Sequence, residues 1–173
     1  MNKILFKETQ QFRQWWVMLF ILAATVPAMI YNVYGFFSEV VQQIPVGNTP
    51  TPAYVFAISF FVLALALWSF FVMKLEVWID REGIHYRFFP QIFRTRLISK
   101  AEIQRYEIRK YSPLVDYGGW GVRRGFGRKW GRGYIVIGNM GLQLYLSNGK
   151  KVLFGTQRSQ AILYAMDEMM KLK

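Results

Sequence analysis

A short segment in the second half of the chain concentrates most of the side chains that could do chemistry. Residues 118–133 read GGWGVRRGFGRKWGRG, with seven glycines, five basic residues and three aromatic residues in sixteen positions. Five cations on so short a segment repel one another unless an anion lies near, and glycine lacks the backbone restriction that favours helices and strands. We therefore expect a flexible loop whose partner lies outside the fold.

The cations and rings of this segment are the predicted binding residues: Arg123, Arg124, Arg128, Lys129, Arg132, Trp120, Phe126 and Trp130. An anionic leaflet attracts each nearby Lys or Arg by about 1 kcal/mol, and aromatic rings sit well among head groups. Glycine N–H groups can also form concave phosphate sites. Two other interpretations remain open. The charges can serve only to keep a hairpin solvated, or the segment can bind single-stranded nucleic acid, although no recognised nucleic-acid motif supports this.

The rest of the sequence offers little catalytic chemistry. Gly119-x-Gly121 and Gly125-x-Gly127 suggest a nucleotide loop, but the next glycines fall at the wrong offsets and no Lys-Ser or Lys-Thr pair follows. His85 is the only histidine, it lies in a predicted strand, and the chain has no cysteine. Because the sequence has no cluster of histidine, cysteine and carboxylate side chains, we expect no catalytic residues, no metal, no cofactor and no enzyme activity.

Two long apolar runs precede this region. Residues 15–37 and 53–73 contain no charged side chain, and Trp and Tyr lie near their ends. At about 1.5 Å of rise per residue, each run covers a hydrocarbon core of about 30 Å, so both are predicted to be transmembrane helices. The alternatives are a buried helix pair in a soluble protein and, for the first run, a cleavable signal peptide. Within the first run, the polar Asn32 needs either a polar partner or a position near the membrane interface.

The distribution of Lys and Arg predicts the orientation of these helices. Three basic residues precede the first run, none occurs in residues 38–52, and residues 74–173 carry 19 basic against 8 acidic residues. Cytoplasmic segments are the ones enriched in Lys and Arg. We therefore expect a multi-pass protein of the cell membrane with both termini in the cytoplasm. The expected domains are residues 1–73, an N-terminal segment with the two helices, and residues 74–173, a cytoplasmic domain.

Residues 74–173 change to an alternating pattern of apolar and polar residues, which is typical of strands. We expect about seven strands, including a hairpin formed by LEVWID and GIHYRFF and another that turns at Asn148-Gly149 through a two-residue loop. Ser99 and Glu102 are spaced to cap a short helical turn. The final residues place Ile162, Ala165, Met166 and Met169 at helical spacing, which predicts a C-terminal helix that covers the sheet.

Three segments carry a resemblance to a known family: LEVWIDREGIHY, GGWGVR and GLQLYLSNGKKVLFGTQR. Together with the two preceding apolar runs, they resemble the bacterial pleckstrin-homology-like (PH-like) membrane proteins of largely unknown function. The resemblance implies an α+β protein with a two-helix transmembrane hairpin and a PH-like antiparallel β-barrel or sandwich capped by a C-terminal helix. It implies contacts with lipid, peptide or a second copy of the chain, and no particular reaction. Fold likeness by itself does not assign function.

The function expected from these observations is a membrane-anchored, non-catalytic binding or scaffold module. It would contact anionic lipid head groups, or a protein partner or a second copy, through the basic glycine-rich segment. A net charge of +12 for the whole chain fits an anionic partner. The alternatives are a membrane-tethered nucleic-acid binder and an accessory subunit of a transporter or membrane enzyme.

Overall fold

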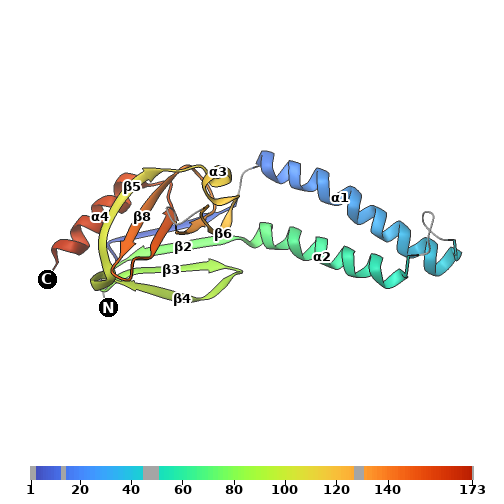
Figure 1. Ribbon diagram of the computed structural model, residues 1–173, viewed down its shortest axis with the longest axis horizontal. Coiled ribbons are helices and arrows are strands. Elements are labelled where there is room, and N and C mark those ends of the chain that lie inside the picture. The colour runs from blue at the N-terminus through green and yellow to red at the C-terminus, as the bar shows by residue number, and fades with distance from the viewer. Residues whose placement is uncertain (1–2, 13–14, 45–50, 127–130, 173) are drawn as a thin grey trace. The chain divides into compact units, whose positions relative to one another are not determined.

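The computed structural model describes residues 3–12, 15–44, 51–126 and 131–172. Contacts between residues divide the chain into two compact units. The first, which we call the β unit, comprises Met1–Phe12 with Val72–Lys173, and the second, the helical unit, comprises Arg13–Phe71. Figure 1 shows the elements of both units.

The helical unit consists of two helices at the predicted positions. Helix α1 spans Trp15–Phe37 and continues into a short π-helical segment at Ser38–Gln42, and α2 spans Ala53–Val72. Both are long and apolar enough to cross a bilayer. Few of their side chains are buried within the unit: only 11% of the most apolar window of the first helix and 6% of that of the second. A helix pair buried in a soluble core would show the opposite pattern.

The two helices contact one another at two places, a polar contact at Asn32 and a close packing contact at Gly35. Asn32 donates to the carbonyl of Ala28 at 2.7 Å and accepts from the Ser59 hydroxyl of α2, which supplies the polar partner that the sequence requires. At Gly35, a Cβ atom would lie 2.4 Å from the ring of Phe56, so only glycine fits. Asn32, Gly35 and Phe56 are accordingly among the few buried residues of these helices.

The β unit contains two sheets. The first has the strand order β1-β2-β3-β4 and the second β5-β8-β9-β7-β6. The strands are β1 (Phe6–Gln11), β2 (Lys74–Ile79), β3 (Gly83–Phe89), β4 (Ile92–Ser99), β5 (Ile103–Lys110), β6 (Gly121–Arg124), β7 (Arg132–Ile135), β8 (Met140–Leu146) and β9 (Lys151–Gly155). A 3-10 turn at Lys100–Glu102 precedes β5, and helix α3 (Pro113–Tyr117) follows β5. Helix α4 (Ser159–Lys171) is the last element.

This arrangement confirms an α+β protein but corrects several details of the prediction. The described residues form nine strands rather than about seven, in two sheets and without a closed barrel. Strand β7 pairs with β9 in parallel, so the second sheet is mixed rather than antiparallel. The additional strands are β1 and β6, neither of which has the alternating apolar pattern that marks the others.

The predicted alternation places the apolar core between the two sheets. Leu75, Val77 and Ile79 of β2 are almost fully buried, and so are Leu142 and Leu144 of β8. Rings connect the sheets, since Tyr86 of β3 lies with its centroid 5.0 Å from that of Phe154 of β9. In α4, the four residues predicted to face the sheet, Ile162, Ala165, Met166 and Met169, are the buried ones, as predicted.

Two predicted turns form with different details. The hairpin at Asn148-Gly149 is present, but its loop contains three residues, because Leu146 pairs with Lys150 and the Gly149 N–H donates to the Leu146 carbonyl. Gly149 alone takes a positive φ, of 74°, whereas a two-residue turn would require Asn148 to do so as well. The turn after Ser99 also forms, although the Ser99 side chain makes no capping hydrogen bond.

The N-terminal segment belongs to the β unit, which differs from the expected division at residue 73. Strand β1 pairs antiparallel with β2 from Phe6↔Ile79 to Gln11↔Lys74. The buried Glu8 carboxylate accepts hydrogen bonds from the Thr156 hydroxyl at 2.6 Å, the Gln157 N–H at 2.9 Å and the Gln10 amide at 3.0 Å. These bonds fasten β1 to the segment between β9 and α4, so the first strand of the chain joins both sheets.

Candidate functional site

The basic glycine-rich segment forms a β-hairpin along much of its length. Strands β6 and β7 pair antiparallel from Gly121↔Ile135 to Arg124↔Arg132, and the Gly125 N–H donates to the Gly131 carbonyl at 2.8 Å. The expected flexible loop is therefore an ordered edge of the second sheet in its described residues. Three predicted binding residues, Arg128, Lys129 and Trp130, lie outside the residues that the structure describes.

The glycines of the hairpin meet steric requirements rather than providing flexibility. Gly131 has a φ of 75°, and a Cβ there would lie 2.2 Å from the backbone oxygen of Lys151 on the neighbouring strand. At Gly133 a Cβ would lie 2.8 Å from the ring of Tyr117. Positive φ and close backbone approach are the two situations that favour glycine. Glycine here lets β7 lie against β9 and α3.

Trp120 packs within the unit rather than in an exposed loop. Its ring is half-buried against a cluster formed by Tyr111, Tyr117, Ile135 and Leu153. It also meets the ring of Phe12 edge-on, with centroids 5.7 Å apart. Phe12 is the last described residue before α1, and its N–H approaches the Met73 carbonyl at 3.4 Å. Trp120 therefore packs at the end of the β unit that contains Phe12 and Met73, which lie close to the two apolar helices in the sequence.

Beside Trp120, an exposed apolar surface adjoins the hairpin. Leu114 and Val115 of α3 are 59% and 75% exposed, and Phe126 of the hairpin is 65% exposed. The Phe126 N–H donates to the Asp116 carbonyl at 3.0 Å, which joins the hairpin to α3. Arg123 lies on strand β6 of the same hairpin, and its Nε donates to the Trp120 carbonyl at 2.9 Å. We call Leu114, Val115, Phe126 and Arg123 the edge patch.

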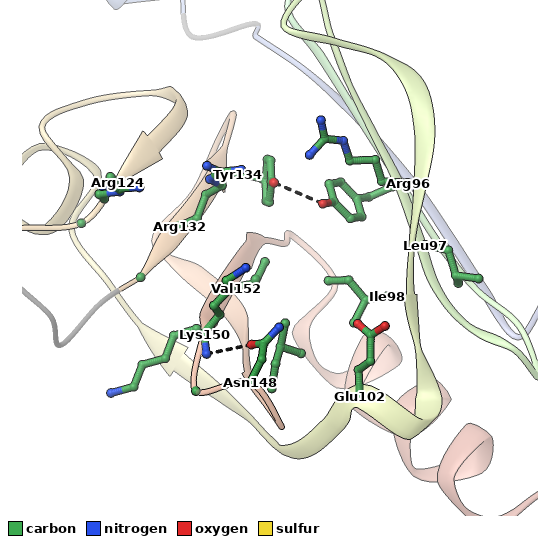
Figure 2. A pocket seen from close by; sticks show the side chains of 16 residues that line it. Arg96, Leu97, Ile98, Glu102, Arg124, Arg132, Tyr134, Asn148, Lys150 and Val152 are labelled. Atoms are coloured by element: carbon green, nitrogen blue, oxygen red, sulfur yellow. Dashed lines mark hydrogen bonds between the residues drawn. The ribbon is translucent and has the colours of Figure 1, made fainter.

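Arg124 and Arg132 line a cleft between the two sheets (Figure 2). The cleft has a volume of about 970 Å³, and Tyr86, Arg96 and Ile98 of the first sheet line it from the other side. A smaller hollow of about 350 Å³ adjoins it and shares Arg96, Arg124 and Arg132. The charged residues among the described lining residues of the cleft are Arg96, Glu102, Arg124, Arg132, Lys150 and Lys151. The cleft is therefore strongly basic.

Pairing of the strands explains how the three arginines come to line one cleft. Arg124 and Arg132 are directly opposite one another on β6 and β7, and Arg96 is opposite Tyr86 on β4 and β3. Side chains opposite each other in an antiparallel pair lie on the same face, about 4.5–5.5 Å apart at Cβ. Tyr134 is two residues after Arg132, so it shares that face. The cleft thus collects residues from the inner faces of both sheets.

Two tyrosines form the floor of the cleft. The hydroxyls of Tyr86 and Tyr134 lie 3.2 Å apart in a hydrogen bond that joins the sheets, marked by a dashed line in Figure 2. Burial and this bond to Tyr134 raise the pKa of Tyr86 well above its ordinary value, against a lowering by Arg96. The Tyr86 hydroxyl therefore keeps its proton at neutral pH, and either tyrosine hydroxyl can be the donor of this bond.

The sequence analysis did not identify Arg96, Lys150, Lys151 or the two tyrosines as site residues. Arg96 lies in a correctly predicted strand, but alternation cannot say that its face meets the second sheet. Lys150 and Lys151 follow the Asn148-Gly149 turn, and their position beside the glycine-rich hairpin depends on the parallel pairing of β7 with β9. The sequence does show basic residues on several predicted strands, but no local pattern indicates which of these strands lie next to one another.

The described part of the β unit has the chemistry of an anion-binding site. Five of its cations, Arg96, Arg124, Arg132, Lys150 and Lys151, line one cleft. His85 is occupied elsewhere, since its Nε2 lies 2.9 Å from Asp80 Oδ2 and its ring stacks on Trp78. Among the described residues, no group of three or more His, Cys, Asp or Glu side chains could hold a metal ion. Comparison with protein-family models, curated proteins and solved structures finds no match to this chain.

Proposed function

We propose that the protein is a membrane-anchored, non-catalytic binding module that holds its β unit against the anionic cytoplasmic surface of the cell membrane. The helices α1 and α2 supply the anchor. Most of their large apolar side chains are exposed within the helical unit, among them Phe20, Phe61 and Leu65. Leaving apolar surface in water costs about 25 cal/mol per Å², so these helices need an apolar environment.

The pairing of β1 with β2 supports a two-helix hairpin whose ends share one side of the membrane. Strand β1 ends at Gln11, shortly before α1, and β2 begins at Lys74, shortly after α2. Two strands that exchange backbone hydrogen bonds cannot be on opposite sides of a bilayer. An even number of crossings therefore separates them, and the Lys and Arg excess in residues 74–173 favours the cytoplasm for both.

The observation that carries the membrane-contact proposal is the edge patch. It combines three exposed apolar side chains with Arg123, and it adjoins Trp120, whose ring touches Phe12 at the tethered end of the unit. Apolar side chains flanked by cations suit the boundary between head groups and acyl chains. Because the unit is tethered to the helices, even a weak contact of this kind is held at a high effective concentration.

The two-sheet arrangement with a C-terminal helix supports a further part of the proposal, that the β unit is a PH-like scaffold. In such a scaffold the sheets provide a rigid frame, and the loops and edges are free to make contacts. The excess of 19 basic over 8 acidic residues in residues 74–173 adds attraction to anionic lipid over the whole unit. Contact with a lipid surface thus combines burial of the edge patch with long-range electrostatics.

The test uses the absence of cysteine from the chain, which permits a single introduced label. The full-length Val115→Cys protein is labelled with an environment-sensitive fluorophore and reconstituted in nanodiscs of phosphatidylcholine, with or without phosphatidylglycerol. We expect a blue shift and protection from an aqueous quencher in the anionic discs. Both should weaken as salt is added, since ions screen exposed charges over about 10 Å at 0.1 M.

The matched control is a label at Tyr164, which is 68% exposed on α4. Tyr164→Cys should stay open to the quencher in both kinds of disc. Adding Arg123→Ser to the Val115→Cys protein should reduce the anion-dependent shift. A Val115 label that is as open to the quencher as the Tyr164 label in both discs would refute the proposed membrane contact.

A further inference from the structure

We propose that the cleft between the two sheets binds a phosphate monoester, with the guanidinium groups of Arg96, Arg124 and Arg132 as its anion ligands. This site is distinct from the membrane contact proposed above, because none of the edge-patch residues lines the cleft, although Arg123 lines the smaller hollow that adjoins it. Its ligand could be a soluble phosphate ester or the exposed phosphate of a lipid, which present the same chemistry.

The arrangement of charge in the cleft calls for an anion. Arg124 and Arg132 are direct cross-strand partners, and like charges in such a pair destabilise a sheet. Among the described residues, no carboxylate forms an ion pair with either of them or with Arg96. Glu102, the carboxylate of the cleft, lies beyond Ile98 from Arg96 in Figure 2. A bound dianion would offset the repulsion of the three guanidinium groups.

The donor set favours a phosphate over a single carboxylate. Each guanidinium presents several N–H donors in a fixed fork that matches two oxygens of a phosphate. The Tyr86–Tyr134 bond uses the hydrogen of one hydroxyl, so in either direction of that bond one hydroxyl hydrogen remains for a further acceptor. Tyr86 and Tyr134 are 6% and 1% exposed, so a ligand oxygen that reached this hydrogen would be bound away from bulk water.

The remaining surface of the cleft suits the organic part of the ester. Leu97, Ile98, Leu146 and Val152 line it, and they adjoin the basic residues. A volume of about 970 Å³ falls at the upper end of the range of about 300–1,000 Å³ that is usual for small-molecule sites. The cleft therefore has room for a phosphate and an attached organic group, whereas a bare phosphate would fill only its basic end.

Isothermal titration calorimetry on the full-length chain in uncharged micelles tests the site, with inorganic phosphate and glycerol 3-phosphate as soluble probes. Nanodiscs of phosphatidylcholine with phosphatidic acid, measured against phosphatidylcholine alone, test the lipid source. We expect glycerol 3-phosphate to bind more tightly than inorganic phosphate if the ester is soluble. Binding only to the phosphatidic acid discs, through the same arginines, identifies a lipid phosphate and also supports the site.

Arg96→Ala is the decisive variant and Arg94→Ala its matched control, because Arg94 lies two residues earlier on β4 and outside the cleft. We expect Arg96→Ala to weaken binding by about 10-fold to 100-fold, as loss of hydrogen bonds to a charged group does, and Arg94→Ala to leave it unchanged. Arg96→Lys keeps the charge but loses the fork, so it should bind with intermediate affinity. Tyr134→Phe should weaken binding by about fivefold.

Three outcomes would overturn the site. The first is that neither soluble ester nor phosphatidic acid discs bind to a chain whose circular dichroism shows it to be folded. The second is that Arg94→Ala and Arg96→Ala weaken binding equally, which would indicate diffuse charge rather than a site. The third is that a single-stranded oligonucleotide binds more tightly than either ester, with a steep salt dependence, and loses affinity in the Arg96→Ala protein, which would assign the cleft to nucleic acid.

Discussion

Replacing Glu8 with alanine should destabilise the β unit far more than the position of this residue near the N-terminus suggests. The Glu8 carboxylate is 8% exposed and accepts three hydrogen bonds, two of them from Gln10 and Thr156, which are 3% and 2% exposed. A hydrogen bond to a charged group contributes about 1.5–3 kcal/mol. The third donor, the Gln157 N–H, belongs to an exposed residue and can bond to water instead.

The expected loss therefore comes mainly from the Thr156 hydroxyl. The Gln10 amide keeps its hydrogen bond to the Gly155 carbonyl at 2.7 Å, so it loses only its bond to Glu8. We expect Glu8→Ala to lower the free energy of unfolding by about 3 kcal/mol. Glu8→Gln keeps the size of the side chain but turns one acceptor oxygen into a donor, so it should fall between Glu8→Ala and the wild type.

Urea unfolding of the full-length chain in uncharged micelles, followed by pulse proteolysis within the β unit, measures this change. Lys7→Ala is the matched control, because Lys7 is the exposed neighbour on β1 and should shift stability by less than about 0.5 kcal/mol. A cycle of Glu8→Ala and Thr156→Ala should give a coupling energy of about 1–2 kcal/mol. If Glu8→Ala matches Lys7→Ala, the strand is not fastened by this network and the reasoning is wrong.

Two further predictions concern other positions of the β unit. Tyr106 donates to Asp167 at 2.6 Å, and burial and this bond raise the pKa of Tyr106 to about 12, so Tyr106→Phe should cost about 1 kcal/mol at neutral pH. Because the unfolded chain releases this proton near pH 10, the difference in free energy of unfolding between the wild type and Tyr106→Phe should decline between about pH 10 and 12. Urea titrations measure this difference, and a value that stays constant over this pH range would contradict the prediction. Gly131→Ala should destabilise by more than about 2 kcal/mol, since its Cβ would clash with the Lys151 backbone, whereas Gly149→Ala, with similar φ and open space, should cost about 1 kcal/mol. Thermal unfolding compares the pair, and equal losses would show that the clash is relieved.

The sequence predicted the helices and strands whose own residues show a clear apolar pattern. The uncharged runs gave the bounds of α1 and α2, because such runs are long and have few alternatives. Alternating apolar residues gave β2, β3 and β8, and the spacing of Ile162, Ala165, Met166 and Met169 gave the buried face of α4. In each case the apolar side of the element follows from its own residues.

Strand β1 escaped prediction because polar residues occupy its inner face. Phe6, Glu8 and Gln10 point inward, and the last two are buried through hydrogen bonds rather than through apolar contact. Its partner β2 also lies beyond both helices in the sequence. Neither composition nor spacing can reveal a strand whose burial depends on a distant hydrogen-bond partner.

The candidate site was predicted only in part, for a related reason. The sequence predicted Arg124 and Arg132 to be binding residues, and the structure places them in a cleft with Arg96, which comes from the other sheet. The packing of one sheet on the other brings these side chains together, and packing is not encoded in any short segment. The glycines were interpreted as flexible because a positive φ and a close contact leave no trace in composition.

The pairing of β1 with β2 sets an order of events during synthesis. The ribosome makes β1 first, but its partner emerges only after both apolar helices have been made, so the nascent N-terminus remains unpaired while α1 and α2 are synthesised. Its inward polar residues keep this waiting segment from being an apolar strand that would aggregate. Completion of the first sheet therefore requires that both helices have already been synthesised.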